Sequence, residues 1–155
     1  ALTAGAPPVG HWSSPCPHIV ADVLANAGFE WVLLDTEHSP NELSMVQHQL
    51  HAMQGGTANP VVRVSWNDMV MIKRFLDIGA QSLLLPYVQN VEEAKQAVIS
   101  INYPQKGMRG VAGGARAMGY GRIQDYHKTA PNELCLAVQV QTRQGMERPQ
   151  RISHS

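Results

Sequence analysis

The stretch Trp31-Val-Leu-Leu-Asp-Thr-Glu-His38 decides the fold. Its opening apolar run has the length of a strand and is typical of a strand buried on both faces of a parallel α/β sheet. The run ends in the ionisable residues Asp35, Glu37 and His38, at the position where parallel α/β folds place their chemistry. An ordinary strand end with solvated acids and a surface histidine is the alternative interpretation.

On both sides of this stretch, strand patterns alternate with helical patterns. The predicted strands cover residues 9–13, 31–35, 60–64, 82–85 and 134–140, and the predicted helices cover residues 18–27, 43–54, 68–78, 91–101 and 123–128. Asn67 or Asp68 is placed to cap the third helix. A glycine-rich stretch at residues 107–121 carries Arg109 and Arg116 and is predicted to be a mobile loop over a site.

Strands that alternate with helices predict parallel βα units within one domain. Five such units fit an open flavodoxin-like sheet. They also fit the first part of a (β/α)₈ barrel, which normally needs about 250 residues. The chain has 155 residues, of which 44% are hydrophobic, and this suffices for one core. The pattern alone leaves both architectures open.

Composition excludes some classes of partner. Twelve basic residues balance twelve acidic ones, so the chain has no general attraction for nucleic acid or anionic membranes. No apolar run approaches the roughly 20 residues of a membrane-spanning helix. Two cysteines without metal-type spacing favour a reducing compartment. We therefore expect a cytoplasmic protein whose partners are small molecules.

Polar residues at the strand ends are the candidates for function. Arg63 lies in the third predicted strand, and a buried guanidinium needs an anion. That anion is either a ligand or a structural partner, Asp35 or Glu37. Gln139 and Gln141 lie on one face of the fifth strand, where their amides either bind a substrate or satisfy one another.

Two further features carry less weight. His48 and His51 lie three apart on a predicted helix, a spacing compatible with metal binding but also typical of a solvated helix face. No lysine falls inside a predicted strand, so a Schiff-base lysine buried in a barrel is not evident.

Several motifs in consistent order resemble the HpcH/HpaI aldolase family. They are Trp31 to His38, Pro60-Val-Val-Arg-Val-Ser-Trp-Asn-Asp68, Leu76-Asp-Ile-Gly79, Leu83-Leu-Leu-Pro-Tyr-Val-Gln-Asn90, Tyr103-Pro104 with Gly107-Met-Arg-Gly110, and Arg122-Ile-Gln-Asp-Tyr126. The resemblance implies an α/β fold, an incomplete TIM (β/α)₈ barrel with about five parallel βα units. It assigns residues 1–146 to a partial aldolase domain and residues 147–155 to a tail outside the family pattern.

The resemblance also implies a metal-dependent class II aldolase, a carbon–carbon lyase that acts on 2-oxo acids through a pyruvate enolate, with an aldehyde as the second reactant. His38 falls on the family's catalytic base, and Asp77 falls on the acid that raises that histidine's basicity. Arg63 falls on the residue that stabilises the developing oxyanion. Gln139 matches a glutamine that contacts the substrate. His38, Arg63 and Asp77 are expected to converge on one pocket mouth.

Two departures from the family pattern bear on activity. Gln141 stands where the family has a glutamate metal ligand, and a neutral amide is a poorer partner for Mg²⁺, Mn²⁺ or Co²⁺ than a carboxylate. The family's second metal ligand, an aspartate after strand six, has no counterpart in the sequence, and neither have strands six to eight. We therefore expect the end of the sequence to reflect a truncation, a shifted frame or an alternative splice.

An incomplete barrel would expose open strand edges, which predicts a homo-oligomer. The alternative function is that of a non-catalytic truncated paralogue. Such a chain would serve as an oligomerisation module or as a module that binds a small oxo acid.

Overall fold

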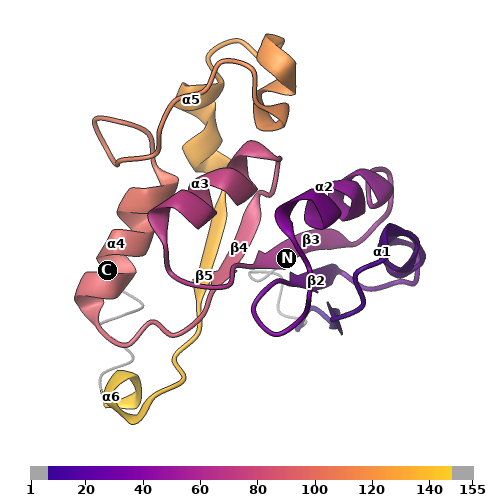
Figure 1. The fold of residues 1–155 in the computed structure, drawn as a ribbon, viewed down its shortest axis with the longest axis horizontal. Helices are drawn as coiled ribbons and strands as arrows, with labels where there is room; N and C mark the ends of the chain where they lie inside the picture. The colour runs from indigo at the N-terminus through magenta and orange to yellow at the C-terminus, as the bar shows by residue number, and fades with distance from the viewer. Residues whose placement is uncertain (1–6, 148–155) are drawn as a thin grey trace.

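A computed structural model describes residues 7–147 as a parallel sheet with helices packed against it (Figure 1). The strands are β1 (Gly10–Ser13), β2 (Trp31–Asp35), β3 (Asn59–Arg63), β4 (Ser82–Leu85) and β5 (Cys135–Val138). The helices are α1 (His18–Ala25), α2 (Leu43–Ala52), α3 (Met69–Asp77), α4 (Val91–Ile101), α5 (Tyr126–Thr129) and α6 (Arg143–Met146), with short 3₁₀ segments η1 (Arg116–Gly121) and η2 (Ala130–Asn132).

The order of the strands decides between the two architectures that the sequence leaves open. All neighbours pair in parallel, and the order across the sheet is β1-β2-β3-β4-β5, the same as along the chain. A flavodoxin-like sheet has a non-sequential order, whereas a (β/α)₈ barrel keeps consecutive strands adjacent. The fold is therefore an incomplete TIM barrel. Within residues 7–147, β1 and β5 are edge strands.

The core lies between the sheet and the helices. Alternate strand residues face the helices and are at most 1% exposed, among them Val32, Leu34, Val62, Leu83 and Leu85. Each such side chain contributes about 1.5–3 kcal/mol through removal of apolar surface from water. The other face of β2 and β3 carries Leu33, Asp35 and Arg63, and this face holds the polar site described below.

Helix α3 shows how the chain passes between the two edges of the sheet. It begins after the carboxyl end of β3, where the Asp68 side chain accepts a hydrogen bond from the Met71 amide at 2.9 Å, which confirms the cap predicted there. It ends at Asp77, and Gly79 follows with φ of 96°, a conformation that glycine adopts without steric strain. Because β4 begins soon afterwards at its amino end, Asp77 lies at the amino edge of the sheet, opposite the carboxyl edge that Arg63 marks.

The glycine-rich stretch differs from the expectation. Arg109 is 0% exposed, and Arg116 donates to His51 Nε2 and to the carbonyl of Ile78, both at 2.8 Å. These arginines hold the stretch against α2 and the end of α3. The prediction of a mobile loop over a site gains no support from these contacts.

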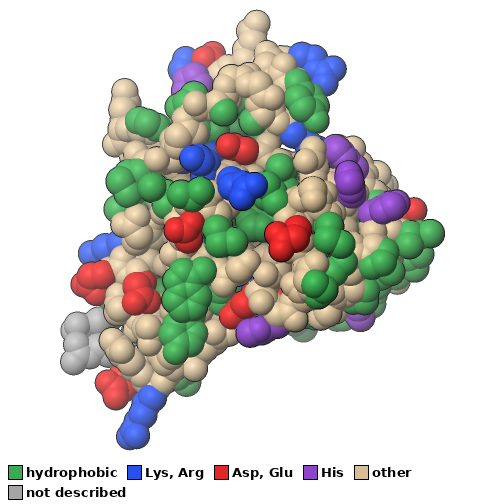
Figure 2. Space-filling model, viewed as in Figure 1, with side chains coloured by type: hydrophobic (Ala, Val, Ile, Leu, Met, Phe, Trp, Pro, Cys, Tyr) green, Lys and Arg blue, Asp and Glu red, His purple; other side chains and the backbone are tan. Residues whose placement is uncertain are grey.

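Across residues 7–147, no helix combines the length and the apolar character needed to cross a membrane. Figure 2 shows acidic and basic side chains interspersed over the viewed face. The predicted tail, residues 147–155, lies almost wholly outside the described residues, so its boundary stays a prediction.

Candidate functional site at the carboxyl edge of the sheet

A buried ion pair lies at the carboxyl edge of β2 and β3. Asp35 and Arg63 are opposite each other in the register of these strands. Arg63 donates from Nε to Asp35 Oδ1 at 2.9 Å and from Nη2 to Oδ2 at 2.7 Å. Arg63 is 6% exposed and Asp35 is 2% exposed. Of the interpretations that the sequence leaves open for Arg63, the structural partner is the one observed.

The ion pair extends to the surface through Glu37 and His38. Arg63 Nη1 lies 2.8 Å from Glu37 Oε2, and Glu37 Oε1 lies 3.4 Å from His38 Nε2. Asp35 Oδ1 accepts hydrogen bonds from the backbone amides of Glu37 at 2.9 Å and His38 at 3.4 Å. These bonds fix the turn after β2. The His38 side chain is 71% exposed, so the imidazole can meet a ligand. Its backbone amide and its Nε2 atom are held by Asp35 and Glu37.

Trp12 is a member of this cluster that the sequence pattern did not reveal. The Arg63 guanidinium lies 4.5 Å from the centre of the Trp12 ring, and Trp12 Nε1 donates to Asp35 Oδ2 at 3.4 Å. Trp12 pairs with Leu33 in the register of β1 and β2, on the face that also carries Asp35. Side chains alternate between the two faces of a strand. This alternation could have placed Trp12 beside Asp35 only if the pairing of β1 with β2 had been known.

The electrostatics of the cluster keep Asp35 ionised. Burial by itself would raise the pKa of Asp35. Hydrogen bonds from Arg63, from the Glu37 amide, from Trp12 and from the His38 amide outweigh burial and lower the pKa from 3.8 to about 2. The Arg63 guanidinium therefore faces an ionised Asp35 on one side and Glu37 on the other.

Asp77 does not join this cluster. Its Oδ1 lies 2.8 Å from Arg109 Nη2 at the amino edge of the sheet, and the Arg109 guanidinium lies 4.5 Å from the centre of the Tyr103 ring. The expected convergence of three groups is thus not observed within this chain. The structure brings His38 and Arg63 together and places Asp77 at the opposite edge.

Gln139 and Gln141 follow β5 at the carboxyl edge. The backbone amide of Gln139 donates to the Leu85 carbonyl at 2.8 Å, and the backbone carbonyl of Gln139 accepts from the Val88 amide at 3.0 Å. Gln139 Oε1 is buried and has no hydrogen-bond partner within the described part of the chain, so it can accept a bond from a ligand. Gln141 is exposed.

The divalent metal implied by the resemblance does not fit the donors that the structure places. Among residues 7–147, no group of three His, Cys, Asp or Glu side chains is arranged to hold a metal ion. The nearby oxygens of Gln139 and Gln141 are neutral amides, and hard divalent cations prefer carboxylates. The donor set therefore lacks the charge that such an ion requires.

Gln141→Glu is expected to strengthen Mn²⁺ binding, because it adds a carboxylate at an exposed position after β5, where the resemblance implies a metal ligand. We expect the dissociation constant to fall by about tenfold, which corresponds to ~1.4 kcal/mol. Water proton relaxation in a Mn²⁺ titration measures it. Gln144→Glu, which adds the same charge at another exposed position, serves as the control. Equal strengthening in both variants would show a general charge effect instead of a ligand.

The histidines on α2 have a structural explanation. His51 Nε2 accepts the bond from Arg116, and burial, Arg116 and His48 lower the pKa of His51, which suits a neutral acceptor. His18 and His48 lie beside it, with ring centres 6.4 Å apart. Figure 2 shows histidine side chains gathered over this part of the surface. The metal interpretation of His48 and His51 gains no support.

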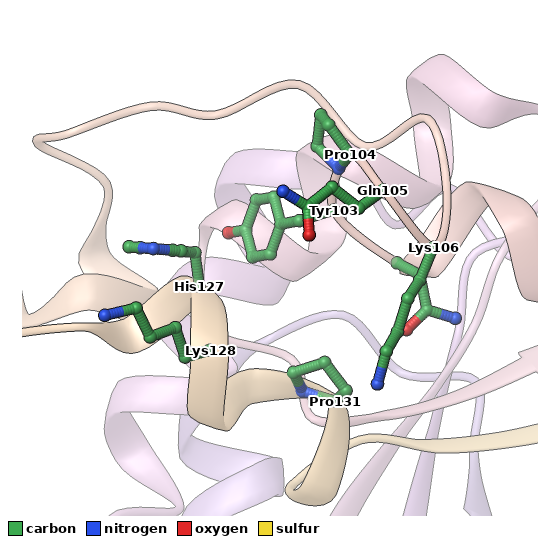
Figure 3. A pocket seen from close by; sticks show the side chains of 8 residues that line it. Tyr103, Pro104, Gln105, Lys106, His127, Lys128 and Pro131 are labelled. Carbon is green, nitrogen blue, oxygen red and sulfur yellow. The ribbon is translucent and has the colours of Figure 1, made fainter.

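A cavity of ≈360 Å³ lies away from the carboxyl-edge cluster (Figure 3). It is lined by Asn102, Tyr103, Pro104, Gln105, Lys106, His127, Lys128 and Pro131. These residues belong to the segment after α4, to α5 and to η2. One of its cations is already engaged, because Lys128 Nζ lies 2.9 Å from Asp125 Oδ1. The cavity and the candidate site are therefore separate features.

Comparisons with known proteins agree with this architecture. The chain is 48% identical over 152 residues to a pyruvate aldolase of Rhizobium etli, with 98% of this chain and 60% of that protein covered. It is 47% identical over 148 residues to a 4-hydroxy-2-oxo-heptane-1,7-dioate aldolase of Klebsiella pneumoniae, with 95% and 56% covered. The chain thus spans less than two thirds of the length of these relatives.

Solved structures show the same fold. A HpcH/HpaI aldolase/citrate lyase family protein from Burkholderia cenocepacia superposes with a TM-score of 0.93 at 35% identity, covering 98% of this chain and 62% of that chain. Macrophomate synthase superposes with a TM-score of 0.78 at 27% identity, covering 96% and 52%. The model of the HpcH/HpaI aldolase/citrate lyase family matches residues 9–155. The chain belongs to the HpcH/HpaI aldolase/citrate lyase family.

Proposed function

We propose that the carboxyl-edge cluster transfers protons in carbon–carbon lyase chemistry on a 2-oxo acid of the pyruvate type, with an aldehyde as the second reactant. The supporting observation is an exposed imidazole, His38, held through Glu37 and Arg63 at the strand edge where barrel enzymes place their chemistry. Family membership and the names of the aldolase relatives agree with this class of reaction.

His38 is the proton carrier in this proposal. Glu37 faces Nε2, which leaves Nδ1 free to meet the substrate. In the cleavage direction, the substrate is a 2-oxo acid with a hydroxyl group on C4. Nδ1 accepts the proton of that hydroxyl, and the bond between C3 and C4 of the substrate breaks. Its electron pair passes to C3 and gives the enolate, while the aldehyde leaves. The imidazolium then returns its proton to C3, which becomes the methyl group of pyruvate. The addition reaction is the reverse.

Arg63 and Gln139 position the oxo acid. Arginine has five N–H donors, and three of those of Arg63 face Asp35 and Glu37. The remaining Nη hydrogens can donate to the enolate oxygen, where developing charge gains most from a fixed donor. The free Oε1 of Gln139 can accept a hydroxyl hydrogen. The exchange assay below tests whether the reaction requires a divalent metal, and no step is assigned to the ion.

Exchange of the pyruvate methyl protons tests this function without an aldehyde. The full chain is incubated with pyruvate in deuterated buffer, with and without Mg²⁺, and the methyl signal is followed by ¹H NMR. We expect loss of the signal, and His38→Ala to slow it at least about a hundredfold, the lower bound for removal of a general base.

His48→Ala is the matched control, because His48 is an exposed histidine on α2 outside the cluster. Exchange that persists in His38→Ala, or no exchange in the unaltered chain with Mg²⁺, would contradict the proposal. Pyruvate line broadening without exchange would instead support the oxo-acid-binding module as the function of this chain.

Self-association is part of the proposal, because β1 and β5 are edge strands within residues 7–147. Cys135 and Ala137 on β5 and His11 and Trp12 on β1 are exposed. Unpaired edge strands offer unused backbone donors and acceptors. We expect light scattering after size-exclusion chromatography to give a mass at least twice that of the 17.0 kDa chain. A sharp monomer peak across the concentration range would contradict it.

A further inference from the structure

An exposed aromatic pair stands at the carboxyl edge of the sheet. The rings of Trp66 and Tyr87 are stacked, with centres 5.3 Å apart and planes inclined by 28°. Trp66 follows β3 and Tyr87 follows β4. They are 53% and 40% exposed, so a large part of each ring stays in contact with solvent. Stacked rings with open area offer a surface on which a further planar group can pack.

The strand order places this pair on the same rim as His38. Asp35, Arg63 and Leu84 lie in one row across β2, β3 and β4. His38, Trp66 and Tyr87 each come three residues after this row, in the loops that follow β2, β3 and β4. The aromatic pair thus belongs to the loops after the two strands that come next to β2 in the sheet.

Tyr87 has an unfavourable backbone conformation. Tyr87 has φ of 61°, in the left-handed region that non-glycine residues seldom adopt. Its neighbours Pro86 and Val88 are buried, and the Val88 amide donates to Gln139. Unfavourable backbone conformations of this kind persist mainly where surrounding structure enforces them, often at binding sites.

The charges on the rim indicate which group suits the pair. The segments 36–39, 65–68 and 86–90 contain two acids, Glu37 and Asp68, and no lysine or arginine. Glu37 is already balanced by Arg63, so a carboxylate at the far end of an aldehyde would gain no lysine or arginine partner from these segments. A neutral aromatic ring would meet two exposed rings.

We propose that Trp66 and Tyr87 form a stacking subsite that selects aromatic aldehydes over aldehydes that end in a carboxylate. This proposal rests on the function proposed for His38, because the aldehyde is the second reactant there. It predicts a partner different in charge from a dioate, the compound class in the printed name of one group of relatives.

Ligand binding to the full chain tests the subsite directly. Benzaldehyde and succinate semialdehyde are titrated separately, and saturation-transfer NMR gives each dissociation constant. We expect benzaldehyde to bind more tightly than the semialdehyde. Trp66→Ala and Tyr87→Ala should each weaken benzaldehyde binding by about three- to tenfold, the range for one aromatic pair.

Two variants serve as controls. Tyr87→Phe keeps the ring and should retain benzaldehyde binding within about twofold. Tyr120→Ala removes a tyrosine that is 58% exposed and also has φ of 58°, but lies in η1 away from the rim. It should leave binding unchanged.

Three results would overturn the subsite. They are equal benzaldehyde binding by the two alanine variants and the unaltered chain, tighter binding of the semialdehyde, and a fall in solution mass on Trp66→Ala. The last would show that the rings cover an interface between copies. Failure of pyruvate exchange is a separate outcome: ring-dependent benzaldehyde binding without exchange would support the subsite while removing the chemistry proposed for His38.

Discussion

Replacement of Arg63 by leucine is expected to lower the free energy of unfolding by about 3–5 kcal/mol at pH 7. The guanidinium lies 2.7 Å from Asp35 Oδ2 and 2.8 Å from Glu37 Oε2, and those side chains are only 2% and 11% exposed. Leucine removes the counter-charge and leaves two carboxylates in a poorly solvated place. Urea denaturation at a fixed protein concentration measures the loss as a lower midpoint with an unchanged slope.

Two further substitutions separate charge from geometry. Arg63→Lys keeps the positive charge but cannot form the two-pronged bond to Asp35, so an intermediate loss is expected. Arg74→Leu removes an exposed arginine on α3 and should change stability by less than about 0.5 kcal/mol. A loss below about 1 kcal/mol in Arg63→Leu would show that water reaches the carboxylates and replaces the guanidinium.

At acid pH, the difference in the free energy of unfolding between Arg63→Leu and the unaltered chain should be smaller. The pKa of Asp35 is about 2 in the folded chain and 3.8 without the fold. A lowered pKa contributes stability above pH 4, which is lost as the pH falls from about 4 to about 2. At about 1.4 kcal/mol for each pKa unit, the contribution is roughly 2 kcal/mol.

In the leucine variant this dependence should be weaker. Burial still raises the pKa of Asp35, and the bonds from Arg63 that lower it are gone, which leaves only those from the Glu37 amide, Trp12 and the His38 amide. Protonation of Asp35 therefore costs the variant less than the unaltered chain, where it removes an ion pair. Denaturation at pH 7 and at pH 3 should therefore show a smaller difference between the two proteins at pH 3. A difference independent of pH would place the effect in packing and not in charge.

The sequence predicted much of the fold because the decisive signal is local. The apolar run of β2 and the periodic helices gave β2, β4 and α4 with the bounds that the structure shows. The fifth strand was predicted to reach residue 140, but it ends at Val138, opposite Leu85, the last residue of β4. A ladder cannot extend past its partner, and that limit belongs to the neighbouring strand. Strand order likewise depends on the helix crossovers and not on the pattern within any strand.

The site was predictable only in part, because its contacts join distant segments. The sequence identified His38 and Arg63 and offered Asp35 and Glu37 as partners for the arginine. Trp12 depends on the pairing of β1 with β2, which so short a strand does not reveal. The resemblance named Asp77 but carried no information on its neighbours in this chain, where α3 takes it to the amino edge. Residue identity could be inferred from motifs, whereas residue placement required the topology.

Asp77→Ala is expected to lower the free energy of unfolding by about 3–5 kcal/mol, because it leaves a buried guanidinium without a counter-ion. Arg109 is 0% exposed, and its Nη2 lies 2.8 Å from Asp77 Oδ1. Its Nε and Nη1 atoms have no hydrogen-bond partner within residues 7–147, and Tyr103 offers only the face of its ring. The carboxylate is thus the one anion that the described chain places on this cation.

A double variant distinguishes the pair from the site at the other edge. Asp77→Ala combined with Arg109→Met removes both charges and should recover at least about half of the loss, since an apolar pair of similar volume can replace a buried ion pair. Asp22→Ala, at an exposed aspartate on α1, should change stability by less than about 0.5 kcal/mol. Unchanged stability in Asp77→Ala, together with a shifted pH dependence of pyruvate exchange, would show instead that this carboxylate acts on His38 as the family resemblance implies. Because α3 carries Asp77 to the amino edge and His38 stands at the carboxyl edge, we expect the stability loss and no such shift.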